Sequence, residues 1–450
     1  MRALAGSTAF AGCTGGLLLR LTAFCVTTLA VLCVAGCGGG SAAVATGPTG
    51  PTNPPGGGTP DTGNTATLVV DSGPTGISAG IVNTPYVTVT ICAPGTTNCQ
   101  TIDHVSVDTG SSGFRVLGSV LNSTLANALK IASNTQSQPY YECLQFADGY
   151  SWGPVTAADV KIAGETASNL PIHIIGSTQV AVPSGCSGGA GQAENTVNSF
   201  GANGILGIAQ FQYDCDTYCS TAPAPEGAYY SCTNSTSSGT CTAAVMPLIQ
   251  QVPNPVFSFP TDNNGTIITL PSLSNAGGAN TTGQLIFGID TQSNNALGNA
   301  TVLHLDGAGN FTAAVNGGTN LTNGGFIDSG SNAYFFTDMG TTVCTSATAK
   351  GFYCPAALQS LQATVSSNGV TATVQFLVQS ADVLFAGNNG NNTAFNDLAG
   401  PTTIPGGPTN GSTDFFDFGL PFFFGRSVYT AVEGKSTSAG AAVSPFNAFK

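Results

Sequence analysis

Short runs of alternating apolar and polar residues, rich in β-branched side chains, recur along the chain from residue 67 onwards. Alternation with a period of two places one face of a strand on a core, and Gly, Asn and Pro between the runs predict turns. The pattern therefore predicts an all-β fold with few short helices. Strands are expected at residues 67–70, 86–91, 104–107, 158–162, 172–175, 267–270, 285–287, 371–376 and 428–432. Helices are expected at residues 121–131, 243–251 and 356–364.

An apolar run at residues 21–35 follows Arg20 and ends in small residues just before Cys37. Such a run before a Cys is typical of a lipoprotein signal peptide, predicted at residues 1–36, with Cys37 as the lipid-bearing first residue of the mature chain. An ordinary secretory signal or a short membrane helix are the alternatives, although a run of about 15 residues is short for a bilayer. Gly38 stands where an Asp often signals inner-membrane retention, so the outer membrane is preferred. The expected location is the cell envelope, lipid-anchored, or the secreted fraction.

Residues 37–65 consist almost entirely of Gly, Pro, Thr, Ser, Ala and Asn. A segment of this composition cannot bury a core and is predicted to be a flexible tether. The whole chain has nine Lys and Arg and a net charge of −13. Because phosphate binding needs clustered cations, nucleic acid is not expected as a partner. The membrane is expected to be contacted only through the lipid anchor.

Ten cysteines follow the predicted signal peptide and its Cys37, an even number that favours disulfides in an exported chain. Cys92 with Cys99, and Cys344 with Cys354, would close short loops, and Cys143 is expected to pair with Cys186. Two further disulfides are expected among Cys215, Cys219, Cys232 and Cys241. The spacing of Cys215 and Cys219 leaves a metal site as an alternative, but no His lies near them in sequence. No metal and no cofactor are predicted.

Two similar turns each follow an apolar strand, one in each half of the chain. Their residues are Asp108, Thr109, Gly110 and Ser111 in the first turn, and Asp328, Ser329, Gly330 and Ser331 in the second. Glycine permits a tight turn, and the hydroxyls can bond backbone groups and fix it. One such turn alone is common in loops, but two in similar contexts suggest one copy per lobe. The lobes are predicted at residues 66–250 and 251–450.

If the two lobes pack face to face, the two carboxylates would meet. Carboxylates in close contact cannot both ionise, so they share a proton and titrate as a pair. Such a pair can hold a water molecule: the ionised member removes its proton while the protonated member polarises a carbonyl. The predicted chemistry is therefore hydrolysis by activated water.

Five segments in order, residues 107–116, 203–208, 285–290, 326–331 and 418–432, resemble those of the pepsin-like aspartic peptidases. The resemblance implies a two-lobed acid protease fold with double-ψ β-barrel lobes, and Asp108 and Asp328 as the catalytic dyad. It also implies that Ser111 and Ser331 hydrogen-bond the carboxylates from outside, while Thr109 and Ser329 brace the turns. The chain also resembles a group of bacterial lipoproteins described only as uncharacterised.

The resemblance implies a hairpin flap over the substrate at residues 145–153, and here the sequence departs from the family. The expected flap and substrate-binding residues are Phe146, Asp148, Gly149, Tyr150 and Trp152. Phe146 stands where a Tyr is usual, so its hydroxyl is missing. Either Tyr150 or Trp152 supplies a polar tip instead, or both simply pack or face solvent.

Two further departures concern charged residues. Arg115 stands where the family usually has a Trp that supports the flap. Asp417 stands where an apolar residue is usual, and it is expected to face solvent, the alternative being that it perturbs the dyad. Asp71 also begins an Asp-Ser-Gly sequence, but Pro74 replaces the hydroxyl residue, so it is not expected to be a site.

These observations favour an aspartic endopeptidase acting on extended polypeptide in a cleft between two β lobes, as a monomer. The main alternative is a catalytically inactive, lipid-anchored binding module that retains the fold, supported by the altered flap. A third possibility is a structural envelope protein in which both Asp turns are accidental. No Gly-x-Ser-x-Gly elbow with a suitable His partner occurs, which disfavours serine-hydrolase chemistry.

Overall fold

The computed structural model describes residues 63–450 except 79, 148, 177–178, 188–190, 224–227, 276, 319, 339, 387–389, 403–414, 439 and 441–442. Cys37, the predicted signal peptide, most of the predicted tether and Asp148 lie outside the described residues. The described residues belong to one compact unit. Within them, no helix combines the length and the apolar composition needed to cross a membrane.

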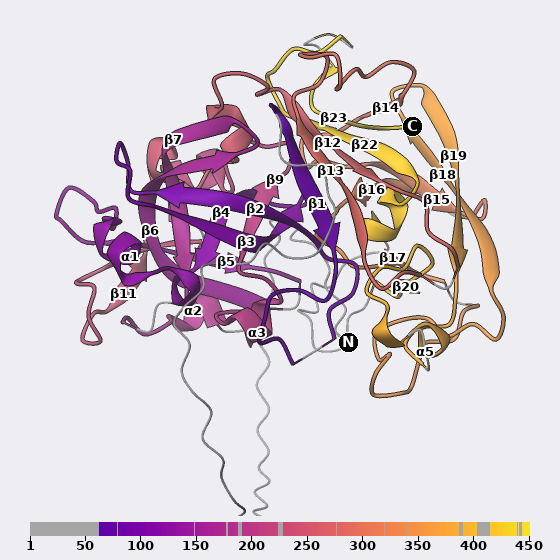
Figure 1. The fold of residues 1–450 in the computed structure, drawn as a ribbon, viewed down its shortest axis with the longest axis horizontal. Coiled ribbons are helices and arrows are strands. Elements are labelled where there is room, and N and C mark those ends of the chain that lie inside the picture. The colour runs from indigo at the N-terminus through magenta and orange to yellow at the C-terminus, as the bar shows by residue number, and fades with distance from the viewer. Residues whose placement is uncertain are drawn as a thin grey trace, which may run out of the picture. The chain divides into compact units, whose positions relative to one another are not determined.

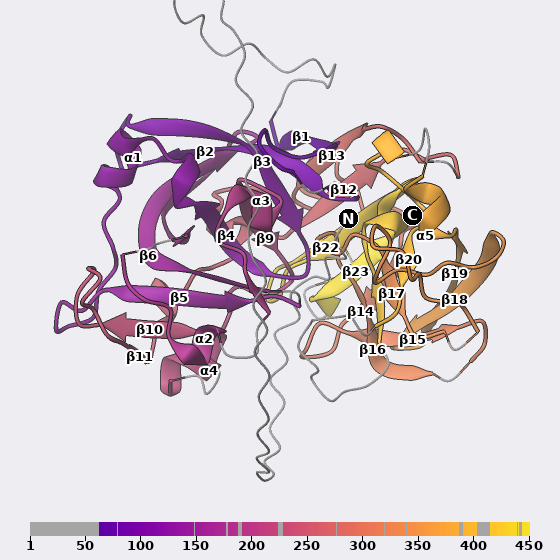
Figure 2. The ribbon, with the colours of Figure 1, turned by 90° about the horizontal axis from the view of Figure 1, so that it is seen from below.

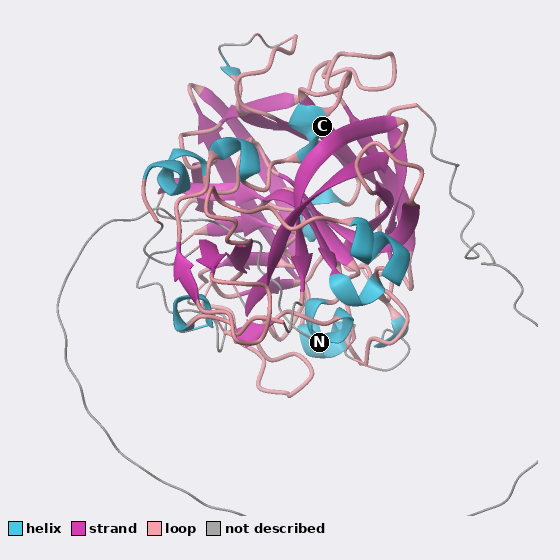
Figure 3. Cartoon of the chain, turned by 90° about the vertical axis from the view of Figure 1, so that its left-hand side faces the viewer, coloured by secondary structure: helices cyan, strands magenta, loops and turns pink. Residues whose placement is uncertain are grey.

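Strands dominate the described chain (Figures 1 and 3), and they form two sheets. The first sheet has the order β11 (Cys241–Ala243), β10 (Tyr229–Cys232), β5 (Tyr140–Gln145), β6 (Gly149–Ile162), β7 (Glu165–Ile175), β4 (Ser112–Leu117), β9 (Gly204–Ile208), β3 (Cys99–Asp108), β2 (Pro85–Cys92), β1 (Thr65–Val70), β13 (Thr281–Phe287), β12 (Gly265–Leu270), β22 (Arg426–Ala431), β23 (Phe446–Phe449) and β14 (Thr301–His304), with β8 (Gln192–Ala193) beside β6. The second sheet has the order β19 (Val370–Val378), β18 (Gln359–Ser367), β15 (Phe311–Val315), β16 (Leu321–Ile327), β21 (Phe416–Phe418), β17 (Tyr334–Phe336) and β20 (Ala399–Gly400).

The described helices are single turns or little more. They are α1 (Ser123–Ala128), α2 (Ser184–Ser187), α3 (Val197–Phe200), α4 (Asp216–Thr221) and α5 (Ala381–Leu384), with 3₁₀ turns η1 (Gly118–Val120), η2 (Leu248–Gln250), η3 (Pro255–Ser258) and η5 (Leu420–Phe423). The all-β fold with few short helices, predicted from the alternating pattern, is confirmed.

The two predicted Asp turns lie in the same strand arrangement, once in each half of the chain. In the first half, β9 runs parallel to β3 and antiparallel to β4, so it lies between the two strands that flank the Asp108 turn. In the second half, β21 runs parallel to β16 and antiparallel to β17, around the Asp328 turn. The internal repeat seen in the sequence is therefore a structural repeat.

A shared group of strands connects the two halves. β1, from the start of the described chain, pairs antiparallel with both β2 and β13, and β13 continues through β12, β22 and β23 to β14. Figures 1 and 2 both show β1, β13 and β12 between the indigo-to-magenta half and the orange-to-yellow half. In β1, alternate residues Ala66, Leu68 and Val70 are fully buried, as the period-two pattern predicts. This continuous pairing fixes the Asp108 half relative to the Asp328 half.

The strands predicted from alternation are all present. None of the three predicted helices forms over its full predicted length. The helix expected at residues 121–131 is shortened to α1, which begins after Asn122, whose side chain accepts a hydrogen bond from the Leu125 backbone. Of the helix expected at residues 243–251, only the turn η2 forms. The helix expected at residues 356–364 is wrong, because this segment enters β18, which pairs with β15 and β19. Pairing on both sides outweighs the helical propensity of its Ala, Leu and Gln residues.

All ten described cysteines form disulfides. They are Cys92–Cys99, Cys143–Cys186, Cys215–Cys219, Cys232–Cys241 and Cys344–Cys354. The three specific pairings predicted from the sequence are confirmed, and the disulfide prediction for Cys215 and Cys219 is confirmed over a metal site. Five disulfides are typical of a protein in an oxidising compartment.

Candidate active site

The two Asp turns meet inside the protein. Asp108 ends β3 and Asp328 directly follows β16, and both side chains are buried. A Cβ atom placed on Gly110 would lie 2.6–2.7 Å from the carboxylate atoms of Asp328, and one on Gly330 would lie 2.5 Å from Asp108 Oδ1. Each carboxylate thus lies over the glycine of the opposite turn. Glycine is required at both positions because any side chain would displace the opposing carboxylate.

Each carboxylate is held by its own turn in the same way. The Gly110 backbone donates to Asp108 Oδ1 over 2.7 Å, and the Gly330 backbone donates to Asp328 Oδ1 over 2.8 Å. The Ser111 hydroxyl donates to Asp108 Oδ2, and the Ser331 hydroxyl donates to Asp328 Oδ2 over 3.0 Å. Each carboxylate thus accepts a backbone and a hydroxyl hydrogen bond from its own turn, which holds it rigidly.

Thr109 and Ser329 join the two turns by a symmetrical set of hydrogen bonds. The Ser329 backbone donates to Thr109 Oγ1 over 2.9 Å, and the Thr109 backbone donates to Ser329 Oγ over 3.1 Å. Each hydroxyl in turn donates to a carbonyl in the opposite strand, Thr109 to Ile327 over 3.4 Å and Ser329 to Val107 over 2.8 Å. The predicted bracing residues thus tie each turn to the other.

Burial raises the pKa of Asp328 well above its usual value, and the negative charge of Asp108 raises it further. The charge of Asp417 and a hydrogen bond with Asp108 act in the same direction, while the Gly330 backbone donor opposes them. Close contact with the Asp108 carboxyl therefore disfavours the ionised form of Asp328.

The prediction that Asp417 faces solvent is wrong. Its side chain is buried, at 1% exposure, in the strand β21 beside the Asp328 turn. Burial raises the pKa of this carboxyl well above its usual value. Asp417 lies one residue before Phe418, whose carbonyl accepts a hydrogen bond from the Asp328 backbone over 3.2 Å. The pairing of β21 with β16 turns this carboxyl inward, a neighbourhood that sequence spacing alone does not reveal.

The expected flap forms a hairpin of β5 and β6, closed by a hydrogen bond of 2.7 Å from the Phe146 backbone to the Gly149 carbonyl. The Phe146 ring packs edge-on against Phe200, with centroids 5.8 Å apart. Tyr150 is partly exposed and pairs with Gln145.

Trp152 is fully buried and is not a polar tip at the flap surface. Its indole stacks on Tyr141, with centroids 5.2 Å apart, and donates a hydrogen bond of 3.3 Å to the Val180 carbonyl. Of the two alternatives left by the sequence, packing is therefore the one that Trp152 adopts.

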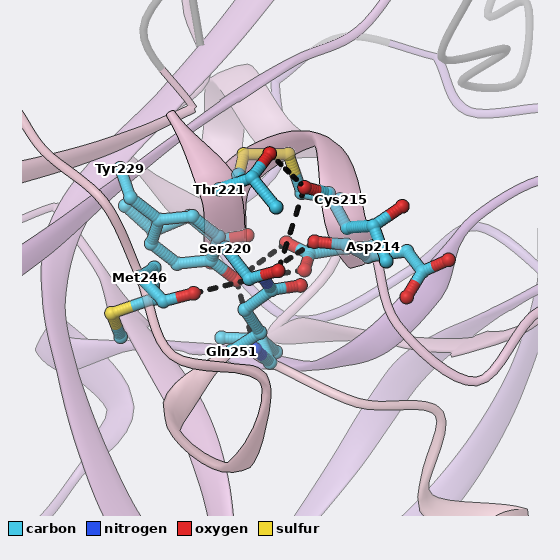
Figure 4. The surroundings of a disulfide bond; sticks show 12 residues. Asp214, Cys215, Ser220, Thr221, Tyr229, Met246 and Gln251 are labelled. Atoms are coloured by element: carbon cyan, nitrogen blue, oxygen red, sulfur yellow. Dashed lines mark hydrogen bonds between the residues drawn. A yellow bond between two sulfur atoms is a disulfide. The ribbon is translucent and has the colours of Figure 1, made fainter. Parts of the chain in front are cut away.

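Arg115 anchors a buried charged cluster that the sequence did not predict. Its guanidinium donates to both oxygens of Glu142 over 3.1 Å and to Asp214 over 3.1 Å. His173 Nδ1 lies 2.8 Å from Glu142 Oε2, and the Tyr229 hydroxyl contacts both Asp214 oxygens over 2.7 Å. Figure 4 shows Asp214 and Tyr229 beside the Cys215–Cys219 disulfide. The signal available in sequence was a lone charged residue within each of several apolar strands, as with Glu142 in β5.

The cluster links the first Asp turn to the base of the flap. Arg115 lies in β4, directly after that turn, and also donates to the Ser112 carbonyl over 2.8 Å. Glu142 lies in the flap strand β5. Although burial opposes its charge, Arg115 and then His173 hold the pKa of Glu142 below its usual value. Burial lowers the pKa of His173, which favours the neutral imidazole. The ion pair of Arg115 and Glu142 thus occupies the place where the resemblance implied an aromatic support.

One group of described residues has the spacing of a metal site, formed by Cys344, Cys354 and Asp382. The two sulfur atoms are bonded to each other in a disulfide, so they are not available as thiolate ligands. The grouping therefore indicates no metal.

Residues 60–449 match the model of a family described as a protein of unknown function (DUF3443), and the chain belongs to that family. Among solved structures, the crystal structure of an aspartic proteinase from Irpex lacteus is similar, with 16% sequence identity and a TM-score of 0.47, over 85% of this chain and 97% of that chain. The search of curated proteins found no match.

Proposed function

We propose that this protein is an aspartic endopeptidase that hydrolyses peptide bonds with water activated by Asp108 and Asp328. The observation that carries the proposal is the convergence of the two buried carboxyls, each lying over the glycine of the opposite turn. The raised pKa of Asp328 beside Asp108 supports a dyad with a single proton. Polypeptide in a cleft between the two lobes would be the substrate.

The proposed reaction uses both protonation states of the pair. Ionised Asp108 takes a proton from water while its oxygen attacks the scissile carbonyl carbon, and protonated Asp328 donates its proton to the carbonyl oxygen. The tetrahedral diol then collapses: Asp108 gives its proton to the amide nitrogen, Asp328 takes a proton from a diol hydroxyl, and the C–N bond breaks to release an acid and an amine. The dyad again holds one proton. The bonds of Thr109 and Ser329 would keep the carboxyls in position throughout.

The same proposal includes attachment to the cell envelope. Cys37 would carry the lipid, residues 37–65 would form the tether, and lobes at residues 66–250 and 251–450 would act as a monomer. The outer membrane is the preferred location, with secretion as the alternative. The five disulfides support export, since they form and persist in oxidising compartments.

A catalytically inactive binding module is the second candidate, and the flap favours it. Phe146 offers no hydroxyl to a bound peptide and packs on Phe200. Digestion of unfolded casein between pH 3 and 7, with and without pepstatin, separates the two. The peptidase predicts pepstatin-sensitive cleavage that is strongest at acid pH. Absence of cleavage at every pH, with peptide binding retained, would support the binding module instead.

A further inference from the structure

Asp417 lies on the same face of the sheet as the proposed dyad. In the parallel pairing of β16 with β21, Asp417 lies opposite Phe326, and Phe418 lies opposite Ile327. Paired residues of neighbouring strands point to one face, and residues two apart along a strand point to the same face. Phe326 is two residues before Asp328. Asp417 therefore shares its face with the Asp328 turn, whereas Phe416 and Phe418 lie in the hydrophobic core on the other face.

The structural repeat supplies an internal comparison for this position. In the first half, Ile205 pairs with Ser106 and lies two residues before Gly207. In the second half, Asp417 pairs with Phe326 and lies two residues before Gly419. Ile205 and Asp417 are therefore equivalent positions of the repeat. Ile205 is buried and apolar, at 6% exposure. The same place in the repeat thus holds a hydrocarbon beside Asp108 and a carboxyl beside Asp328. The fold does not require the carboxyl, since the first copy forms without one.

The charged groups that face Asp417 are the two dyad carboxylates, and no cation among the described residues perturbs it. On the neighbouring strands its paired residues are Phe326 and Phe335, both apolar. Among the described residues, the Ser331 hydroxyl is the group that favours the ionised form of Asp417. A carboxyl at 1% exposure without a cationic partner is costly to keep, which indicates a use at the site.

We propose that Asp417 is a positioning residue, a third carboxyl of the site whose negative charge keeps the dyad singly protonated up to higher pH. This inference rests on the proposed peptidase function for its effect on rate, but the coupling itself does not need catalysis. The charge of Asp108 raises the pKa of Asp417, and the charge of Asp417 raises that of Asp328. Because like charges oppose each other, a negative charge on Asp417 disfavours the ionised form of Asp328.

The direction of the effect follows from the sign of this coupling. Once Asp417 is ionised, its negative charge makes the loss of the remaining proton from Asp328 less favourable. Removing the charge should let Asp328 lose its proton at lower pH. For two charges on neighbouring strands in a partly screened interior, the expected shift is at least about one pH unit. The alkaline limb of the pH–rate profile should move down by that amount, while the acid limb stays in place.

The test is to compare the full-length wild-type protein with Asp417→Asn and Asp417→Ile, the latter restoring the residue of the first repeat. Asp397→Asn is the matched control: Asp397 is equally buried and belongs to the same half of the chain, but it does not perturb Asp328. Casein cleavage is measured from pH 3 to 8. In parallel, NMR of protein with ¹³C-labelled aspartate carboxyls follows the titration of Asp328 without depending on activity.

In both Asp417 variants, the alkaline decline in rate is expected to move to lower pH by about one unit. The pH at which Asp328 loses its proton should move in the same direction. Asp397→Asn should leave both unchanged. Removing a buried carboxyl should stabilise the protein at high pH, so earlier unfolding would not explain a downward shift. Active variants with the wild-type profile would overturn the inference while leaving the peptidase intact. If no form cleaves casein, the peptidase proposal fails, and the NMR titration decides alone: a lowered Asp328 pKa supports the coupling, and an unchanged one overturns it.

Discussion

Thr109 and Ser329, 220 positions apart in the sequence, each accept a hydrogen bond from the backbone of the other. Both residues are buried, at 3% and 0% exposure, so water cannot replace a lost partner. The two bonds lie directly beside Asp108 and Asp328. The separation of the carboxyls is therefore set by contacts between the two repeats.

Thr109→Val should test this link. The valine is similar in shape but leaves the Ser329 amide without its acceptor, which should cost about 1–3 kcal/mol of unfolding free energy. Urea unfolding measures the loss. Thr101→Val is the control, because Thr101 is exposed and its hydroxyl makes an exposed hydrogen bond with that of Thr90. It should change stability by less than about 0.5 kcal/mol. Equal losses in the two variants would contradict a special role for Thr109.

In the buried cluster around Arg115, the effect of removing one charge on the free energy of unfolding should depend on whether its partner is still charged. Arg115→Met would leave Glu142 ionised and buried without its main partner, at a cost of about 3–5 kcal/mol. Neutralising the partner as well, in Arg115→Met with Glu142→Gln, should recover part of that loss. Unfolding free energies of the single and double variants measure the recovery. Additive losses would show that the Arg115–Glu142 ion pair does not hold the cluster together.

The disulfides should differ in their contribution because they close loops of different length. Cys143–Cys186 spans 43 positions and fastens the flap strand β5 to α2, whereas Cys215–Cys219 spans four. Replacing both cysteines by serine should cost about 4 kcal/mol for the first pair and about 2 kcal/mol for the second, by the entropy of the unfolded chain. Guanidinium unfolding of the two double variants gives the comparison. A larger loss for the Cys215–Cys219 pair would contradict the argument.

Asp397 predicts a dependence of stability on pH. Burial raises its pKa from 3.8 to about 7, so between these values the folded state binds a proton that the unfolded state does not. The carboxyl therefore destabilises the fold progressively as the pH rises through this window. Asp397→Asn should be more stable than wild type at pH 8, and the advantage should disappear near pH 4. Thermal unfolding at both pH values is the measurement, and an equal difference at the two would contradict it.

Features that repeat along the sequence could be predicted from it. Contacts that depend on how distant strands pair could not. Period-two alternation located the predicted strands, and the two Asp turns identified the carboxyls that the structure brings together. The sequence could not show that Asp417 faces inward, because that depends on the pairing of β21 with β16. Nor could it assemble Arg115, Glu142, His173 and Asp214, since these residues come from separate elements and each alone resembles an ordinary polar position. The segment at 356–364 was assigned wrongly because its composition favours a helix, while its two partner strands make it β18.

The most direct test of the central claim compares two single substitutions of the same chemical kind. Asp108→Asn removes one member of the proposed dyad, whereas Asp71→Asn alters the partly exposed Asp-Ser-Gly turn that makes contact with His104 instead. Initial rates of casein cleavage are measured at the optimum pH of the wild-type protein. Asp108→Asn should lose activity by at least about a hundredfold, since it removes the proposed general base, and Asp71→Asn should retain it. Cleavage at the wild-type rate by Asp108→Asn would contradict the account.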